Sequence, residues 1–230
     1  MGQTKPSRIL DAADALLVSF GYRKVTVDEV ARRAGVGKGT VYLYWPSKLE
    51  LFAAVLTREA AKLLAEQLAA LRADPAEARL HRAWRRSFIE VMHRPLARAL
   101  YTRDSEVLGE LLTTNKIGLQ FAAGKSATTA RHLSVLYKHG LLSDNPAADP
   151  VLSYRLSAAV TGSFLLEGMP GAADIDLTDK ADALATTLRR AFEPTTEPTP
   201  TMLHSAAADL TELYQQWLAD LTTALPGEHT

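Results

Sequence analysis

The 230-residue sequence contains no cysteine, which excludes disulfides, thiol redox chemistry and Cys-ligated zinc. No apolar run reaches the roughly 18 residues that cross a membrane, and no secretory signal pattern is present. Catalytic and metal-binding patterns such as G-x-S-x-G, H-E-x-x-H and histidine pairs spaced i, i+4 are also missing. We therefore expect a cytoplasmic protein that is not an enzyme, with no cofactor, no metal site and no membrane partner.

The formal net charge is zero, but the charges are unevenly distributed along the chain. Residues 1–48 hold eight Lys and Arg against four Asp and Glu, and the rest holds 18 against 22. From Ala191 to the end there are six acidic residues and no Lys or Arg. This asymmetry favours contact between the N-terminal segment and a polyanion such as DNA. The alternative is a solvated basic face without a partner, because modest imbalances of this kind are common.

One stretch, residues 26–48, carries the signals of two short helices joined at a fixed angle: TVDEVARRAGVGKGTVYLYWPSK. Thr26 and Glu29 have the spacing of a capping box, and Gly35 follows the last turn of the first helix, where a left-handed residue ends helices readily. A second helix of about two turns is predicted from Lys38 to Tyr44. Together they predict a helix-turn-helix, whose second helix is short and narrow enough to enter a DNA major groove.

The second helix and its flanks offer the groups that a DNA interface needs. Glycines allow the backbone to approach DNA, Lys38 and Thr40 can meet base edges, and tyrosine and lysine side chains can reach sugar and phosphate. The residues predicted to bind DNA are Thr26, Gly37, Lys38, Gly39, Thr40, Tyr42, Tyr44 and Lys48.

The run GVGKGT invites a second interpretation as a nucleotide phosphate loop. A Walker loop requires G-x-x-x-x-G-K-[ST] after a buried strand, and a dinucleotide fingerprint requires G-x-G-x-x-G in the same place. Here the run follows a helical segment and has neither spacing. The context therefore argues against nucleotide binding.

The same residues, with Phe20-Gly21-Tyr22 before them and Leu49, Leu51 and Phe52 after them, resemble the DNA-binding domain of the tetracycline-repressor (TetR) family. The resemblance covers the first fifth to quarter of the chain in one ungapped run. Two departures are Gly37, where the family often has Ser or Ala, and Trp45-Pro46, where Phe and a variable residue are usual. The resemblance implies a dimeric transcriptional regulator, most often a repressor, that binds a palindromic double-stranded DNA operator and is released by a small-molecule effector.

Helical spacing of apolar residues continues to the end of the chain, and no stretch alternates with period two, so we expect an all-α fold. Asn115 to Gly124, with two glycines, is predicted to be a break before a helix from Ser126 to His139, and PTTEPTPT at 194–201 a linker. The expected domains are a three-helix DNA-binding domain at 1–47, a helical ligand-binding and dimerisation domain at 48–193, and a linker with an extra amphipathic C-terminal helix at 194–230. The other helices are expected at about 7–20, 48–71, 75–94, 96–101, 105–114, 150–169, 179–192 and 203–225.

The helix from Pro150 to Met169 is apolar on nearly all sides and must be covered on several of them. The family layout implies a homodimer through helices at about 150–169 and 179–192; burial within one subunit is the alternative. The resemblance also implies an effector pocket for a mostly apolar molecule, although such side chains commonly form plain core. The candidate ligand residues are Trp84, Phe88, Met92, Tyr101, Phe121, Tyr137, Phe164 and Glu167. A ligand-independent architectural DNA-binding protein and a helical enzyme remain as alternative functions.

Overall fold

The computed structural model describes residues 3–112, 117–149, 151–169 and 174–226, and every regular element in these ranges is a helix. The all-α prediction is therefore confirmed. The elements, with η marking a 3-10 helix, are α1 (Lys5–Lys24), α2 (Val27–Ala34), α3 (Lys38–Tyr44), α4 (Lys48–Ala73), η1 (Pro75–Ala78), α5 (Leu80–His93), α6 (Pro95–Thr102), α7 (Ser105–Leu108), η2 (Gly109–Leu112), α8 (Ile117–Lys138), α9 (Leu152–Leu166), α10 (Leu177–Phe192) and α11 (Pro200–Thr223).

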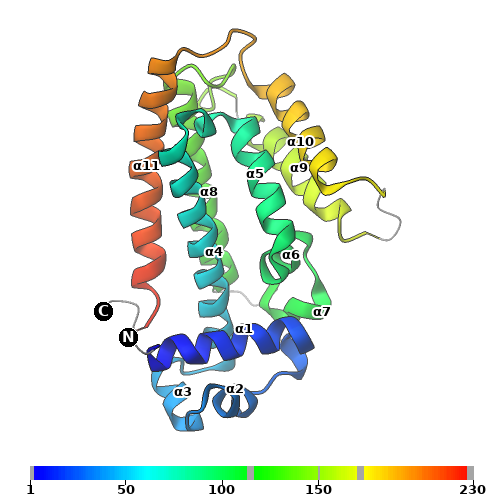
Figure 1. Cartoon of the computed structure of the whole chain (residues 1–230), viewed down its shortest axis with the longest axis vertical. Helices are drawn as coiled ribbons and strands as arrows, with labels where there is room; N and C mark the ends of the chain where they lie inside the picture. Colours follow the sequence, from blue (N-terminus) through cyan, green and yellow to red (C-terminus); the bar gives the residue numbers. More distant parts are fainter. Residues whose placement is uncertain (1–2, 113–116, 150, 170–173, 227–230) are drawn as a thin grey trace.

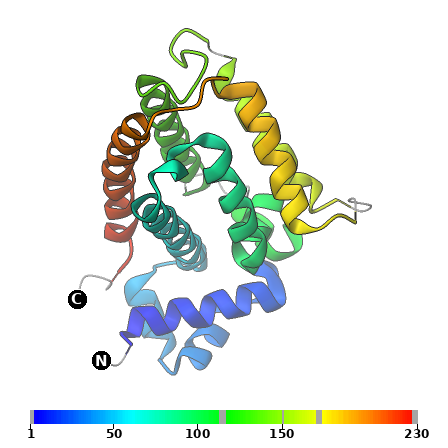
Figure 2. The same cartoon turned by 45° about the horizontal axis from the view of Figure 1, so that its top comes forward.

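The molecule has a head made of α1, α2 and α3 at one end and a body made of the longer helices (Figure 1). α4 leaves the head and runs into the body, where α11 lies along it and α5 packs on another side (Figures 1 and 2). α10 packs on α5, and α9 packs on α6 and α10. This arrangement places α2 and α3 at the far end of the molecule from the linker that precedes α11.

Two clusters of buried apolar residues form the cores of head and body, and two helices, α4 and α6, together with the chain around α11, contribute to both. α4 gives Leu51, Phe52 and Val55 to the head core and Leu64, Leu68 and Leu71 to the body core. α6 gives Leu96 and Ala99 to the head core and Ala97 to the body core. Leu210 and Leu213 of α11 lie in the body core, whereas Leu225, just after the helix, is buried in the head core. Head and body are thus joined by packed side chains as well as by the chain.

The linker before α11 is fastened by an ion-pair cluster at the end of α10. The Glu193 carboxylate is almost completely buried, and accepts hydrogen bonds from Arg79 at 3.1 Å and from the His81 backbone N–H at 2.8 Å. Burial alone would raise the pKa of Glu193, but hydrogen bonds with the side chain and the backbone N–H of His81, together with the nearby charges, lower it below its usual value. Glu197 in the linker pairs with the same arginine at 2.5 Å. The start of α11 is therefore held against η1 and α5.

The predicted break between Asn115 and Gly124 is wrong from Ile117 onward, because α8 begins at Ile117 and continues through both glycines to Lys138. A single glycine costs a helix about 1 kcal/mol relative to alanine, which is too little to stop a helix of 22 residues that packs against α11. The helix expected from Ser105 to Thr114 is split after Leu108, because Gly109 adopts a positive φ of 50°. The helix expected from Pro75 begins as the short η1 and becomes α-helical at Leu80.

A buried polar pair joins α8 to α11. The Tyr214 hydroxyl lies 2.6 Å from His132 Nδ1, and His132 Nε2 is buried with no hydrogen-bond partner among the described residues. Burial lowers the pKa of His132 to about 4, because the surroundings cannot solvate an imidazolium. The folded chain therefore binds this proton at lower pH than the unfolded chain, whose histidines titrate near pH 6.5.

This difference predicts acid-sensitive stability. Between about pH 6.5 and pH 4 the unfolded chain holds the His132 proton and the folded chain does not. The free energy of unfolding must therefore decrease as the pH is lowered through this range. A His132→Asn variant cannot titrate there and should lose less stability than the wild type between about pH 7 and pH 5 in urea unfolding. His204→Asn, at an exposed position of α11, is the matched control and should keep the wild-type loss. If all three proteins lose the same free energy of unfolding over this pH range, His132 is not the group responsible for the acid sensitivity.

Candidate nucleic-acid interface

α3 is held against the head by one side and leaves the other side open. Val41 is 1% exposed and Trp45, immediately after the helix, is buried with it in the head core. Lys38, Gly39, Tyr42 and Leu43 face solvent, and Thr40 and Tyr44 are half-buried at the edges. The helix therefore presents its first turn and one long side to whatever lies beyond the end of the molecule.

The angle between α2 and α3 is fixed by local hydrogen bonds. Gly35 adopts the left-handed conformation at φ 66° and ψ 40°, and the Val36 N–H donates to the Ala31 carbonyl at 3.0 Å. At the start of α2 the Thr26 hydroxyl accepts from the Glu29 N–H, and Glu29 accepts from the Thr26 N–H at 2.8 Å. The Thr26 N–H and hydroxyl both donate to the Glu29 carboxylate and lower its pKa, so the capping box is ionised at neutral pH. Both predicted signals are present, and the Thr26 hydroxyl is engaged within the chain.

Both predicted DNA-binding lysines have intramolecular partners. Lys38 pairs with Asp28 of α2 at 2.7 Å, and this contact raises the pKa of Lys38. Lys48 Nζ donates to the Tyr22 carbonyl at 2.5 Å and lies 4.2 Å from the centre of the Tyr22 ring. Lys38 lies on the head and Lys48 begins α4 next to it. Contact with DNA requires Lys38 to exchange an exposed ion pair, and Lys48 also has a structural role at the start of α4. Their roles in DNA binding stay predictions.

The two glycines at the start of α3 are open to the outside. A Cβ added at Gly39 would meet no atom within 4 Å, and one at Gly37 would meet only the Thr40 hydroxyl at 3.9 Å. Neither glycine has a positive φ. The packing of the chain therefore does not require glycine at either position, which is consistent with close approach by another molecule.

Sequence reasoning missed three exposed residues on this end of the head. Arg32 and Arg33 are exposed in the last turn of α2, where they add positive charge to the surface of the head. Leu43 is 84% exposed on α3. The helical spacing could have found it, because Leu43 is four residues from Gly39 and lies opposite Val41 and Trp45.

The predicted ligand residues fall into two groups. Phe88, Tyr101 and Phe164, here called the aromatic cluster, lie in the body with ring centroids 4.9 Å apart for Phe88–Phe164 and 4.7 Å for Tyr101–Phe164. The other five predicted residues form the second group and do not belong to the aromatic cluster. Trp84 and Met92 are partly buried against the same core, Glu167 pairs with Lys180 at 2.9 Å, Tyr137 lies on the surface, and the Phe121 side chain is outside the described residues.

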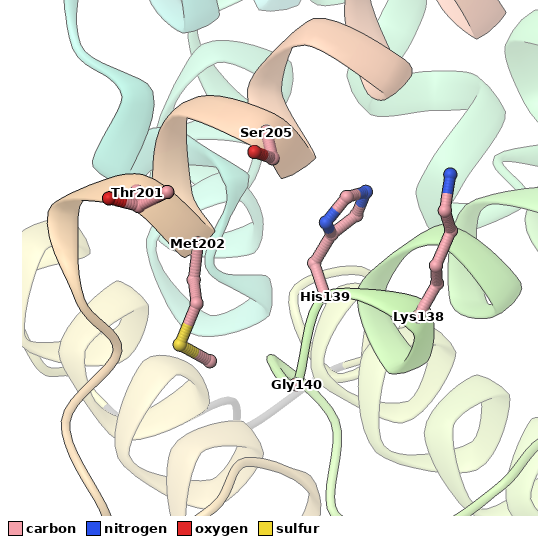
Figure 3. A pocket seen from close by; sticks show the side chains of 6 residues that line it. All are labelled: Lys138, His139, Gly140, Thr201, Met202 and Ser205. Atoms are coloured by element: carbon pink, nitrogen blue, oxygen red, sulfur yellow. The ribbon is translucent and has the colours of Figure 1, made fainter.

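Two surface hollows lie elsewhere. One is lined by the end of α8 and the start of α11, at Lys138, His139, Gly140, Thr201, Met202 and Ser205 (Figure 3). The other lies where α1 meets α4 and α6, and Asp11, Asp14, Glu59 and Arg94 are among its lining residues. Neither contains a predicted ligand residue, whereas Phe88 and Phe164 of the aromatic cluster are buried in the body core. Among the described residues no group of His, Cys, Asp or Glu could hold a metal ion, and no helix could span a membrane.

Comparison with known proteins identifies the head. Residues 9–55 match the family model for bacterial regulatory proteins of the tetR family. Over 165 residues the chain is 33% identical to Rv2250c, an uncharacterised HTH-type transcriptional regulator of Mycobacterium tuberculosis; the match covers 66% of this chain and 86% of that protein. The chain belongs to the TetR family. It is therefore a transcriptional regulator with a DNA-binding helix-turn-helix, and not an enzyme.

Other HTH-type transcriptional regulators and solved structures show how far the likeness extends. The repressor KstR of Rhodococcus jostii is 50% identical over 52 residues (23% of this chain, 24% of KstR), and the activator FasR of Mycolicibacterium smegmatis is 43% identical over 65 residues (28% and 30%). The structure of SmeT with triclosan matches with a TM-score of 0.61 and 25% identity over 86% of this chain and 100% of SmeT. NalD of Pseudomonas aeruginosa, a repressor of a multidrug efflux pump, matches with a TM-score of 0.59 and 19% identity over 84% and 98%. The body fold is thus that of the family.

The exposed ring of Tyr42 gives a test of this interface. Tyr42→Ala removes a side chain that is 41% exposed, and we expect weaker binding to all DNA sequences by a similar factor, because sugar and phosphate contacts carry no sequence information. Tyr137→Ala removes an equally exposed ring from α8 and should bind DNA as the wild type does. Anisotropy titrations on an operator and on a random duplex measure both. Wild-type affinity in the Tyr42 variant would place the DNA surface elsewhere.

Proposed function

We propose that the chain is a homodimeric repressor that binds a palindromic operator and is released when a small, mostly apolar molecule enters its body. The observation that carries the proposal is the open side of α3, held outward by Val41 and Trp45. We assign DNA binding to residues 1–47 and effector binding and dimerisation to residues 48–193. Residues 194–230 form a linker and the C-terminal helix. Repression is favoured over activation by KstR and NalD, which are named repressors, although FasR is named an activator.

Support for the dimer comes from the two sides of α9. Leu152, Leu156, Val160 and Phe164 recur every four residues and are buried in the body core. Large apolar side chains are exposed on α9 at Tyr154 and Leu166 and just beyond its ends at Val151 and Met169, with exposed Ser157 and Thr161 among them. Such exposed apolar side chains fit a partner helix, and Ala158 among them is small enough for close approach. Burial within one subunit accounts for only one side of α9.

Support for an effector comes from the position of the aromatic cluster. Tyr101 is on α6, which also places Leu96 and Ala99 in the head core. Phe164 is on α9, the helix proposed to form the dimer interface. A molecule that separates these rings would move α6 relative to α9 and so change the position of each head in the dimer. The solved complex of SmeT with triclosan, an aromatic compound, supports this ligand class.

The mechanism of release follows from the geometry of two heads on one duplex. Both copies of α3 must enter the major groove at half-sites about 34–36 Å apart or a multiple of that distance. An effector that changes the separation of the heads prevents both from binding at once and removes the gain from bivalent binding. It can do so only if it binds the non-docking dimer more tightly.

The function is tested by selecting bound duplexes from random DNA. A regulator should return one discrete palindrome, and apolar aromatic compounds that raise the melting temperature should release that DNA at micromolar to millimolar concentration. Recovery of many unrelated sequences, with no compound able to release them, would favour an architectural DNA-binding protein. Release by compounds that leave the melting temperature unchanged would contradict an effector site in the body.

The dimer is tested by sedimentation. The wild type should sediment at twice the chain mass of 25.0 kDa, and a variant with Tyr154→Glu and Leu166→Glu should sediment as a monomer, because two carboxylates would be buried without partners. The matched control is Thr223→Glu at an exposed position near the end of α11. A wild type that is monomeric at micromolar concentration would overturn the proposed dimer. A double variant that stays dimeric would overturn the proposed interface at α9.

A further inference from the structure

Leu43 is the most exposed of the large apolar side chains described on the head. It is 84% exposed on α3, against 57% for Phe20 on α1 and 41% for Tyr42. A leucine held in water in this way contributes nothing to the core of its own chain. Any favourable free energy that this side chain supplies must therefore come from contact with a molecule that binds to α3.

The surroundings of Leu43 point in the same direction. Gly39 lies one helical turn earlier, and Thr40 lies beside it, so the three residues share the outward side of α3. A Cβ at Gly39 would meet nothing within 4 Å, and glycine weakens a helix relative to alanine. The chain thus has a bare backbone beside an exposed leucine on the helix that faces DNA.

The chemistry of the major groove leaves one partner for such a side chain. Guanine, cytosine and adenine present hydrogen-bond donors and acceptors there, and only thymine presents an apolar group, its C5 methyl. A leucine can neither donate nor accept a hydrogen bond, so the favourable contact available to it is with that methyl. Close approach at Gly39 would bring the helix deep enough for the contact to form.

We propose that Leu43 is a specificity-determining residue that selects thymine at one position of each half-site by contact with its C5 methyl group, with Gly39 setting the depth of α3. The inference rests on the proposed function, because it needs a discrete operator. It assigns a base to a residue that sequence reasoning did not place in the interface.

The test is a double-mutant cycle on the selected operator. Deoxyuridine replaces thymine at each position in turn, which deletes only the methyl and leaves base pairing unchanged. At one position per half-site the wild type should lose about four-fold in affinity, the value of one buried methyl group. Leu43→Ala should lose a similar factor on the thymine operator and should not distinguish thymine from deoxyuridine at that position.

The controls separate a specific contact from damage to the head. Phe20→Ala removes another exposed apolar residue of the head and should retain full sensitivity to every deoxyuridine. Gly39→Ala should bind all duplexes more weakly while its melting temperature stays unchanged or rises. Melting curves of Leu43→Ala should match the wild type, since the side chain touches no core.

The outcomes distinguish this inference from the proposed function. If selection yields a palindrome but Leu43→Ala stays as sensitive as the wild type to every deoxyuridine, or if the half-sites contain no thymine, the contact is wrong and the repressor stands. If Leu43→Ala binds the operator as tightly as the wild type, the contact is also wrong. If selection yields no discrete site, the proposed function fails, and this inference fails with it.

Discussion

The structure depends on the burial of one side of a seven-residue helix. Val41 and Trp45 insert into the head core and fix the orientation of α3, which is too short to be stable alone. Because these anchors lie on one side, the other side is rigidly presented without any partner of its own. A helix-turn-helix that reads DNA needs this combination, since its exposed side chains must keep their positions before the duplex arrives.

Head and body are coupled through packing and through ion pairs. Arg58 of α4 is buried and bonds Asp11 of α1 at 2.7 Å, while the ion pair of Arg94 with Glu59 at 3.2 Å holds the start of α6 to α4 within the body. With Leu96 of α6 and Leu225 beyond α11 in the head core, three separate parts of the body are attached to α1–α3. A shift of any of them must move the head or break buried contacts. The C-terminal helix is therefore part of the coupling and not a loose addition.

Local features could be predicted from the sequence, and distant partnerships could not. The capping box of Thr26 and Glu29 and the left-handed Gly35 were predictable, because each depends on residues a few positions apart. The pairing of Lys48 with the Tyr22 carbonyl joins residues 26 apart and has no sequence signal. The same is true of Leu225 in the head core. The break predicted after Asn115 gave glycine too much weight, since tertiary packing outweighs the propensity of single residues.

The central claim, that two copies of α3 enter one duplex together, is tested most directly by a hydroxyl-radical footprint at single-nucleotide resolution on the selected operator. The account predicts two protected segments related by two-fold symmetry, with the major-groove centres 34–36 Å or a multiple of that distance apart. One protected segment, or even protection along the whole duplex, would contradict it.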